Sequence, residues 1–356
     1  MMKQPAYVTF DKQMTGIIKG VAILFMLLLH CYQDNYDVSL DFSYSLTGYS
    51  GFFKLCVGMY VFMVGYGYAF SKTKDFRYGF QHIKKLLKSF WVILFVFTLP
   101  FCFREVLNDD FKTLFYNLFG IDSHYNWYSW FVYFFIYAML VMPFISRFID
   151  KKPLRNTAIA VIVAAFLIGA VHEIPRVSSM LFGIHLPPTE QMRLAYALYN
   201  SLLMTPCMLL GYLFARNGYY ERIRVDKCSK GLTLAICLIV LLLTFVLRRY
   251  VKIYHFPIHK DFFQIPFLIG AIVLLFNKFR WDALRRVLVK IGELSVYMWF
   301  FHALFFTTPV RWFYQPMITI FGHINLVVLW AILFTFIASW IIKTIVDWVM
   351  MRLKSN

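Results

Sequence analysis

Two ionisable residues, Lys19 and His30, stand inside the first long apolar run of the chain, TGIIKGVAILFMLLLHC (residues 15–31). In a helix their spacing is close to a whole number of turns, so both side chains project from one face, about 16 Å apart along the axis. An ionisable group at membrane depth is costly and usually faces a bundle interior or a water-filled cavity. Histidine in such a cavity is suited to proton transfer. Asp34, one turn beyond His30, is placed to orient the imidazole.

Plainer explanations exist for the same three residues. A packing histidine, bonded to a neighbouring backbone carbonyl, would account for His30. A lysine that snorkels to the cytoplasmic interface would account for Lys19. Asp34 is equally explained as a solvated loop residue.

A second polar group lies in the later apolar run KIGELSVYMWFFHALFF (residues 290–306). Ser295, Trp299 and His302 share one face of a helix, and Glu293 and Tyr297 share a neighbouring face. A polar face inside an apolar helix must be buried against protein or water. We expect it to bind substrate, and a hydrogen-bonded seam between helices is the alternative.

Lys84, Lys85 and Lys88 precede the third apolar run, in QHIKKLLKSFW. Three ammonium groups at the end of a membrane span can bind a polyanion, such as a phosphorylated cofactor. Lysines at the cytoplasmic end of a span are also expected from membrane topology alone. Trp127 and Trp130, in HYNWYSWFVYFFIY, belong to an aromatic belt at the outer interface, where one or two rings can also stack on a sugar.

The composition indicates the kind of molecule that positions these residues. Hydrophobic residues make up 60% of the 356 residues and charged residues only 15%, whereas a soluble domain carries about a quarter charged residues. We therefore predict an all-α, polytopic membrane protein, a single transmembrane domain over 1–356 without a separate soluble domain. Ten runs are long enough to span a bilayer. They lie at 15–33, 50–71, 85–103, 126–147, 156–173, 193–215, 231–250, 262–278, 288–309 and 324–350.

The formal charge of +18 comes from clusters of Lys and Arg between these runs, without any nucleic-acid-binding motif. The basic clusters fall in the even-numbered gaps, and the first gap is acidic, so we expect both termini to be cytoplasmic. The basic seventh gap, RRYVKIYHFPIHKD, fits this topology least well. Its His255 and His259 bracket Pro257, and no metal-ligand spacing occurs elsewhere, so we predict no metal site.

Five segments, in chain order, resemble signatures of the family 3 membrane acyltransferases. KGVAILFMLLLH resembles the arginine, ten residues and histidine of helix one in that family. FMVGYGYAFSK resembles the end of its second span, and IKKLLKSFW resembles its RxxR approach to the third span. WYSWFVYFFIY and IGELSVYMWFFH resemble two later spans.

The resemblance implies transfer of an acyl group, commonly acetyl from acetyl-CoA, to a hydroxyl of a surface polysaccharide or lipid-linked sugar. It implies a catalytic role for His30, with Lys19 in place of the family's arginine and Lys85 and Lys88 in place of its RxxR pair. Lysine offers a point charge rather than a planar fork for phosphate. Val64 stands where the family usually has serine, so no role is assigned to it.

These expectations together describe a multi-pass enzyme of the bacterial cytoplasmic membrane. Acyl-CoA would enter from the cytoplasm past Lys19, the acceptor hydroxyl would come from outside past Trp127 and Trp130, and His30 would take its proton. The alternative is a transporter or flippase for a glycan or lipid substrate. A membrane subunit without catalytic activity would not explain why Lys19 and His30 are placed in the membrane, where an ionisable side chain costs free energy.

Overall fold

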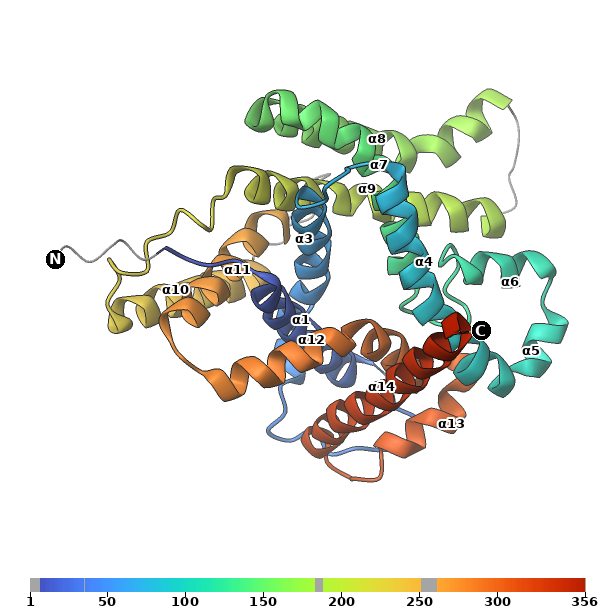
Figure 1. Ribbon diagram of the computed structural model, residues 1–356. Helices are drawn as coiled ribbons and strands as arrows, with labels where there is room; N and C mark the ends of the chain where they lie inside the picture. The colour runs from blue at the N-terminus through green and yellow to red at the C-terminus, as the bar shows by residue number, and fades with distance from the viewer. Residues whose placement is uncertain (1–6, 35, 183–187, 251–260, 356) are drawn as a thin grey trace.

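Helices form the framework of the protein in the computed structural model (Figure 1). It describes residues 7–34, 36–182, 188–250 and 261–355, and the side chains of these except 169–195, 261 and 353–355. Within these ranges there is no β-strand, only two isolated bridges, Tyr7 with Arg224 and Asp41 with His323. The all-α fold class predicted from composition is confirmed.

The helices fall into long apolar segments and short connecting segments. The long ones are α1 (Lys12–Gln33), α3 (Leu55–Ala69), α4 (Phe76–Val92), α7 (Trp130–Lys151), α8 (Pro153–Phe182), α9 (Pro188–Asn217), α10 (Lys230–Tyr250), α11 (Asp261–Lys278), α12 (Asp282–His302) and α14 (Ile324–Ser355). The short ones are η1 (Thr47–Tyr49), α2 (Ser50–Phe53), η2 (Ile93–Thr98), η3 (Leu99–Phe101), α5 (Phe103–Asn108), α6 (Phe111–Leu118), η4 (Ala303–Phe305) and α13 (Thr308–Ile318).

Every predicted span corresponds to a helical segment. Among the described residues, seven helices are long and apolar enough to cross a membrane, and Pro153–Ile168 and Phe262–Lys278 are shorter apolar helices. The third predicted span is built differently from the rest, since α4 passes into the π-helical turn η2 and then η3. The phenol of Tyr314 donates to the carbonyl of Phe97 at 2.6 Å, which satisfies one group inside the irregular turn.

Contacts between connecting segments follow the predicted alternation of sides. At the side predicted to be cytoplasmic, the amide of Val8 donates to the carbonyl of Ile223 at 3.0 Å. At the opposite side, the amide of Asp41 donates to the carbonyl of Gly322 at 2.8 Å. Each of these two contacts therefore joins segments that the charge pattern assigns to the same side.

Helix α1 packs on α3, α12 and α14, and glycines allow its closest approach, to α12. A Cβ at Gly20 would lie 2.2 Å from the carbonyl oxygen of Leu288, and a Cβ at Gly292 would lie 2.0 Å from that of Gly16. Gly16 and Gly20 form a GxxxG pair, the spacing by which membrane helices bring their backbones together. The contact fixes α12 beside the helix that carries Lys19 and His30.

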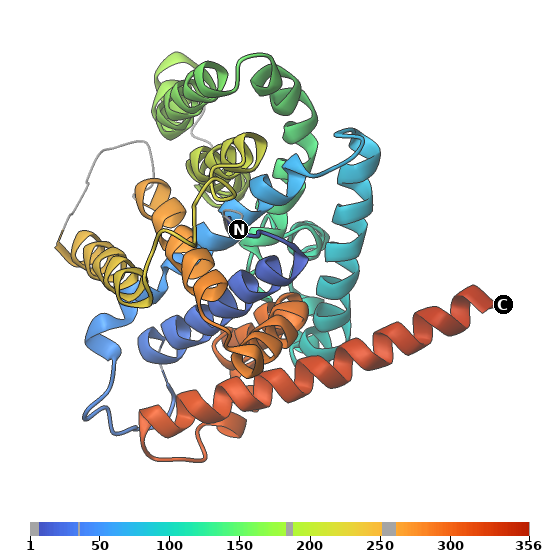
Figure 2. The same cartoon turned by 60° about the vertical axis from the view of Figure 1, so that its left-hand side comes forward.

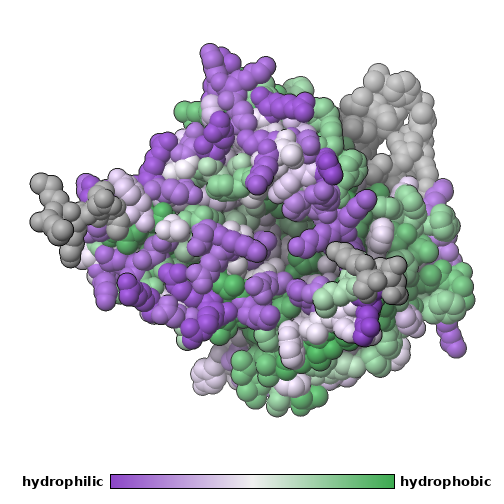
Figure 3. All heavy atoms as spheres, viewed as in Figure 1, coloured by the Kyte–Doolittle hydropathy of each residue, from purple (hydrophilic) through white to green (hydrophobic). Residues whose placement is uncertain are grey.

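The surface agrees with a membrane location. In Figure 3 hydrophilic residues gather over the face toward the viewer, and hydrophobic residues occupy much of the lower and right-hand edge. Figure 2 shows α14 running along one edge of the bundle, with its carboxyl end extending beyond the other helices. Its exposed apolar side chains, Trp340, Ile345 and Trp348 among them, are suited to lipid.

Candidate active site

The site is organised around the imidazole of His30 in the last turn of α1. Its Nδ1 lies 3.1 Å from Oδ2 of Asp34, and the His30 side chain is 16% exposed. An ionised carboxylate only accepts hydrogen bonds, so Nδ1 carries the proton and Nε2 is left as a base. Asp34 is the carboxyl-terminal cap of α1, where its amide donates to the carbonyl of His30 at 2.9 Å. The helix end therefore holds the carboxylate one turn from the imidazole.

Tyr128 covers this pair from the segment just before α7. Its hydroxyl donates to Oδ2 of Asp34, and its ring centroid lies 3.8 Å from that of His30. The indole of Trp299 in α12 donates to the carbonyl of Tyr128 at 3.0 Å. Asp34 is thus held by two donors, and the covering segment is fixed by α12.

His302, the last residue of α12, adds a second imidazole. It is fully buried, with its ring centroid 5.3 Å from that of His30 and its ring stacked on Tyr128 at 5.2 Å. Nδ1 lies 3.1 Å from the carbonyl of Met298 and must donate to it, so Nε2 bears a lone pair. That buried Nε2 has no hydrogen-bond partner within the described part of the chain.

A small cavity of about 80 Å³ opens beside Asp34 on the side predicted to be outside. It is lined by Gln33, Asp34, Trp127, Phe306 and Arg311. The guanidinium of Arg311 lies 2.7 Å from a carboxylate oxygen of Asp37, so its charge is already partly compensated. The lining offers aromatic faces, an amide, a carboxylate and a guanidinium, so it can form both apolar and hydrogen-bonded contacts.

Tyr36 closes the wall next to this cavity. Its hydroxyl donates to the carbonyl of Cys31 at 2.9 Å, and its ring meets that of Phe306 edge-on at 5.9 Å. Burial raises the pKa of the Tyr36 hydroxyl, so it stays neutral and acts as a donor.

The polar residues predicted to share a site on α12 lie in different surroundings in the structure. Ser295 is buried and bonds with the hydroxyl of Tyr60, which also reaches the carbonyl of Lys19 at 3.2 Å. Tyr297 is buried and bonds with Ser89 of α4. These two residues therefore join helices, as the seam alternative requires.

Glu293 is not part of the site. Its side chain is 56% exposed, and it lies 3.6 Å from Lys290 on the same helix. The reason is geometrical, because the residues before and after it, Gly292 and Leu294, occupy the buried side of α12. Trp130 is also placed elsewhere, since it opens α7 and contacts the ring of Phe131 rather than the cavity that Trp127 lines.

The predicted lysines fall into two groups. Lys19 interacts electrostatically with Lys85 across the α1 and α4 helices. No carboxylate of the described residues pairs with the side-chain nitrogen of Lys19 or of Lys85. Lys84 and Lys88 instead line an apolar groove on another face of α4.

Sequence reasoning missed the role of Tyr128 and did not single out Gln33 or Arg311. Tyr128 and its partner Asp34 are distant in the chain, and no local spacing links them. Arg311 is the one Lys or Arg between the ninth and tenth predicted spans, and this was the available signal for it.

The described residues contain no group of three His, Cys, Asp or Glu side chains that could hold a metal ion. His255 and His259 lie outside the described residues. The site consists of imidazole, carboxylate, phenol and ammonium groups, and these support proton transfer and anion binding.

Comparison with protein families gives one match, to the model described as Acyltransferase domain, over residues 16–344. No curated protein and no solved structure matches the chain. The match begins before Lys19 and His30 and ends after His302 and Arg311, so it includes every residue of the site.

Proposed function

Because the chain belongs to the family 3 acyltransferases, we propose that it transfers an acyl group, acetyl in particular, from acyl-CoA to a sugar hydroxyl. The acceptor is a surface polysaccharide or a lipid-linked sugar of the bacterial cell envelope. The observation that carries this proposal is the cluster of His30, Asp34 and Tyr128, a base with its orienting carboxylate at one end of an apolar helix.

His30 acts as the general base of the reaction. Nε2 of His30 takes the proton from the acceptor hydroxyl, while the oxygen of that hydroxyl attacks the carbonyl carbon of the thioester. The carbon–sulfur bond then breaks, and the proton on Nε2 passes to the departing CoA thiolate. Asp34 keeps the proton on Nδ1, so the imidazole presents the correct nitrogen throughout, and Tyr128 holds Asp34 in place.

Lys19 and Lys85 bind the phosphates of the donor. The absence of a described counter-ion for either lysine supports this role, because two neighbouring ammonium groups are stabilised by an anion between them. Lys19 and His30 are about 16 Å apart along α1. The pantetheine arm extends along this face and brings the thioester toward His30.

The acceptor binds at the cavity beside Asp34. Trp127, which is 40% exposed, offers its ring to one face of a sugar, and Gln33 and Arg311 offer hydrogen bonds. The unpaired Nε2 of His302 accepts a hydrogen bond from the bound substrate, which satisfies a buried group that otherwise lacks a partner. Charges of both signs around the cavity favour a neutral sugar over an anionic one.

The test uses purified protein in sealed proteoliposomes, with radiolabelled acetyl-CoA on one side and a neutral oligosaccharide on the other. Label that becomes covalently attached to the oligosaccharide supports the proposal. Transfer only when both substrates are on the same side would contradict acyl transfer across the membrane. Movement of a glycan without any acyl transfer would indicate a transporter instead.

A further inference from the structure

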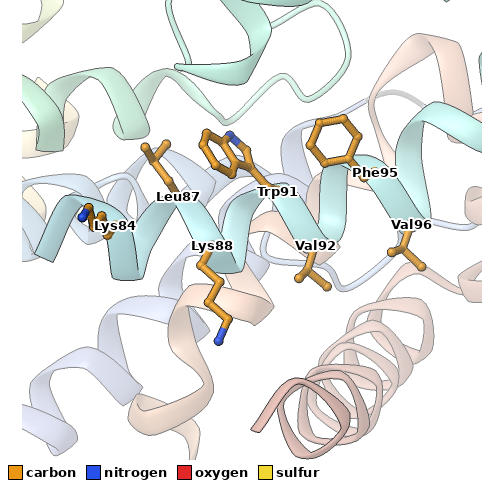
Figure 4. Close-up of a pocket in the computed structure, with 7 residues that line it drawn as sticks. All are labelled: Lys84, Leu87, Lys88, Trp91, Val92, Phe95 and Val96. Carbon is orange, nitrogen blue, oxygen red and sulfur yellow. The ribbon is translucent and has the colours of Figure 1, made fainter. Parts of the chain in front are cut away.

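An apolar groove of about 440 Å³ runs along α4 and η2, separate from the cluster at His30. Figure 4 shows Lys84 and Lys88 at one end, with Leu87, Trp91 and Phe95 in a row along the helix. Val92 and Val96 form the second edge beside Lys88. The groove thus has a cationic end and an apolar length.

The groove faces away from the centre of the bundle. The opposite side of α4 is the packed one, where Ile83, Leu86 and Phe90 are buried, and Leu87 at the inner edge of the groove is buried as well. Phe95 and Val96 are 49% and 56% exposed. In a membrane these side chains contact hydrocarbon, because α4 and η2 form the third span.

Its charge favours an anionic ligand. Lys84 and Lys88 are one turn apart, and no described carboxylate pairs with either of them. Both stand at the end of the span that the charge pattern assigns to the cytoplasm, where anionic lipid headgroups attract lysines. We propose that this groove binds one anionic phospholipid, with its phosphate between Lys84 and Lys88 and an acyl chain along Leu87, Trp91 and Phe95.

Acyl-CoA fits the groove less well, although it is also anionic. In CoA the phosphates are followed by the two amides of pantetheine, which need hydrogen-bond partners when they leave water. Beyond the lysines, the only polar side-chain atom in the lining is the indole nitrogen of Trp91, and it already donates to the carbonyl of Leu118 at 2.8 Å. A phospholipid has hydrocarbon at that point, which is what the lining accommodates.

The length of the groove agrees with this ligand. From Lys84 to Val96 the helix rises about 18 Å at 1.5 Å per residue. One leaflet of the bilayer core is about 15 Å thick. A single acyl chain therefore extends along the groove from a headgroup at the lysines, and the bond from Trp91 to Leu118 holds the indole ring as a fixed part of the floor.

The experiment measures phospholipid retention by native mass spectrometry after purification from vesicles of equal phosphatidylglycerol and phosphatidylcholine. Each lysine near an anionic headgroup contributes roughly fivefold, so the pair gives a preference of about 30-fold for phosphatidylglycerol. The Lys84→Gln, Lys88→Gln variant should lose this preference, and Lys84→Arg, Lys88→Arg should keep it. Lys85→Gln is the matched control, because Lys85 lies outside the groove lining.

A second variant tests the apolar part without changing charge. Val96→Trp fills the groove, so it should reduce retention of phosphatidylglycerol while both lysines remain. The proposal is overturned if the double glutamine variant retains phosphatidylglycerol as the parent does, if only Lys85→Gln loses it, or if CoA displaces it competitively. None of these readouts requires acyl transfer, so failure of the proposed function would leave the test intact.

Discussion

The imidazoles of His30 and His302 lie with ring centroids 5.3 Å apart, at the corresponding last turns of α1 and α12. Each ring has Nδ1 bonded to an acceptor, Asp34 for His30 and the carbonyl of Met298 for His302. Both rings therefore present Nε2 as an acceptor. Two neighbouring acceptor atoms are stabilised by a hydroxyl group that donates a hydrogen bond to one of them.

Replacement of His30 tests the base directly. We expect His30→Gln to lower kcat for acetyl transfer by about 10² to 10⁴, because glutamine cannot take the proton. Affinity for CoA, measured by calorimetry in detergent, should stay close to that of the parent. His323→Gln, a change in a histidine that bonds to the carbonyl of Ser43 away from the site, is the control. Full turnover by folded His30→Gln protein would disprove the mechanism.

Asp34 and Tyr128 act on His30 as one unit. We expect Asp34→Asn to reduce kcat about 10²-fold or more, because an amide can no longer fix the proton on Nδ1. Tyr128→Phe should reduce kcat less, since Asp34 remains. The effects of the two changes should not add in the double variant, because both act through the same carboxylate. Strictly additive effects would show that Tyr128 acts independently of Asp34.

Lys19 and Lys85 should determine affinity for the donor. Loss of a hydrogen bond to a charged group typically costs about 1.5–3 kcal/mol, so Lys19→Gln and Lys85→Gln should each raise the Kd for CoA roughly tenfold or more. The effect of Lys85→Gln should shrink as salt rises, because the charge of this exposed side chain is screened. Lys54→Gln, on the opposite side of the predicted membrane, should leave the Kd unchanged. Equal CoA affinity in all three variants would mean that Lys19 and Lys85 do not contact phosphate.

The approach of α1 to α12 should be sensitive to a single methyl group. Gly20→Ala puts a Cβ 2.2 Å from the carbonyl oxygen of Leu288, so the helices must separate. We expect a loss of about 1–3 kcal/mol in stability, seen as a lower unfolding midpoint in detergent. Gly67→Ala in α3 is the control, because no atom lies within 4 Å of the added Cβ. An unchanged midpoint for Gly20→Ala would show that this contact is loose.

Sidedness is tested with reporters. The basic even-numbered gaps predict that both termini are in the cytoplasm. A reporter enzyme that works only in the cytoplasm should therefore be active when it is fused after Asn356, and one that works only outside should be inactive. A reporter inserted after Gly48 should show the opposite behaviour. Activity outside the cytoplasm for the fusion at Asn356 would reverse the predicted direction of transfer.

The parts of the fold that could be predicted are those that depend only on residues close together in the sequence. Apolar length determines the spans, and a spacing of four residues places Asp34 beside His30 in any helix. The rotation of α12 about its axis was less accessible, because Glu293 and His302 are both polar and only packing against α1 decides which one is buried. The same holds for α4, where adjacent Lys84 and Lys85 belong to different faces.

Contacts between distant segments could not be predicted at all. Tyr128 contacts Asp34 because the segment before α7 lies beside the end of α1, and no sequence pattern predicts that contact. The π-helical turn at Ile93–Thr98 also escaped prediction, since its apolar residues are compatible with an ordinary helix. Its stabilising partner, Tyr314, comes from a segment near the other end of the chain.

The pairing of α1 with α12 has a consequence for biosynthesis. The helix that carries Lys19 and His30 is made before its glycine-lined partner α12, which carries His302 and fixes Tyr128 through Trp299. In a nascent chain, His30 therefore enters the bilayer before the α12 residues that surround it in the folded protein. The complete cluster of His30, Tyr128 and His302 therefore forms only after α12 has been inserted.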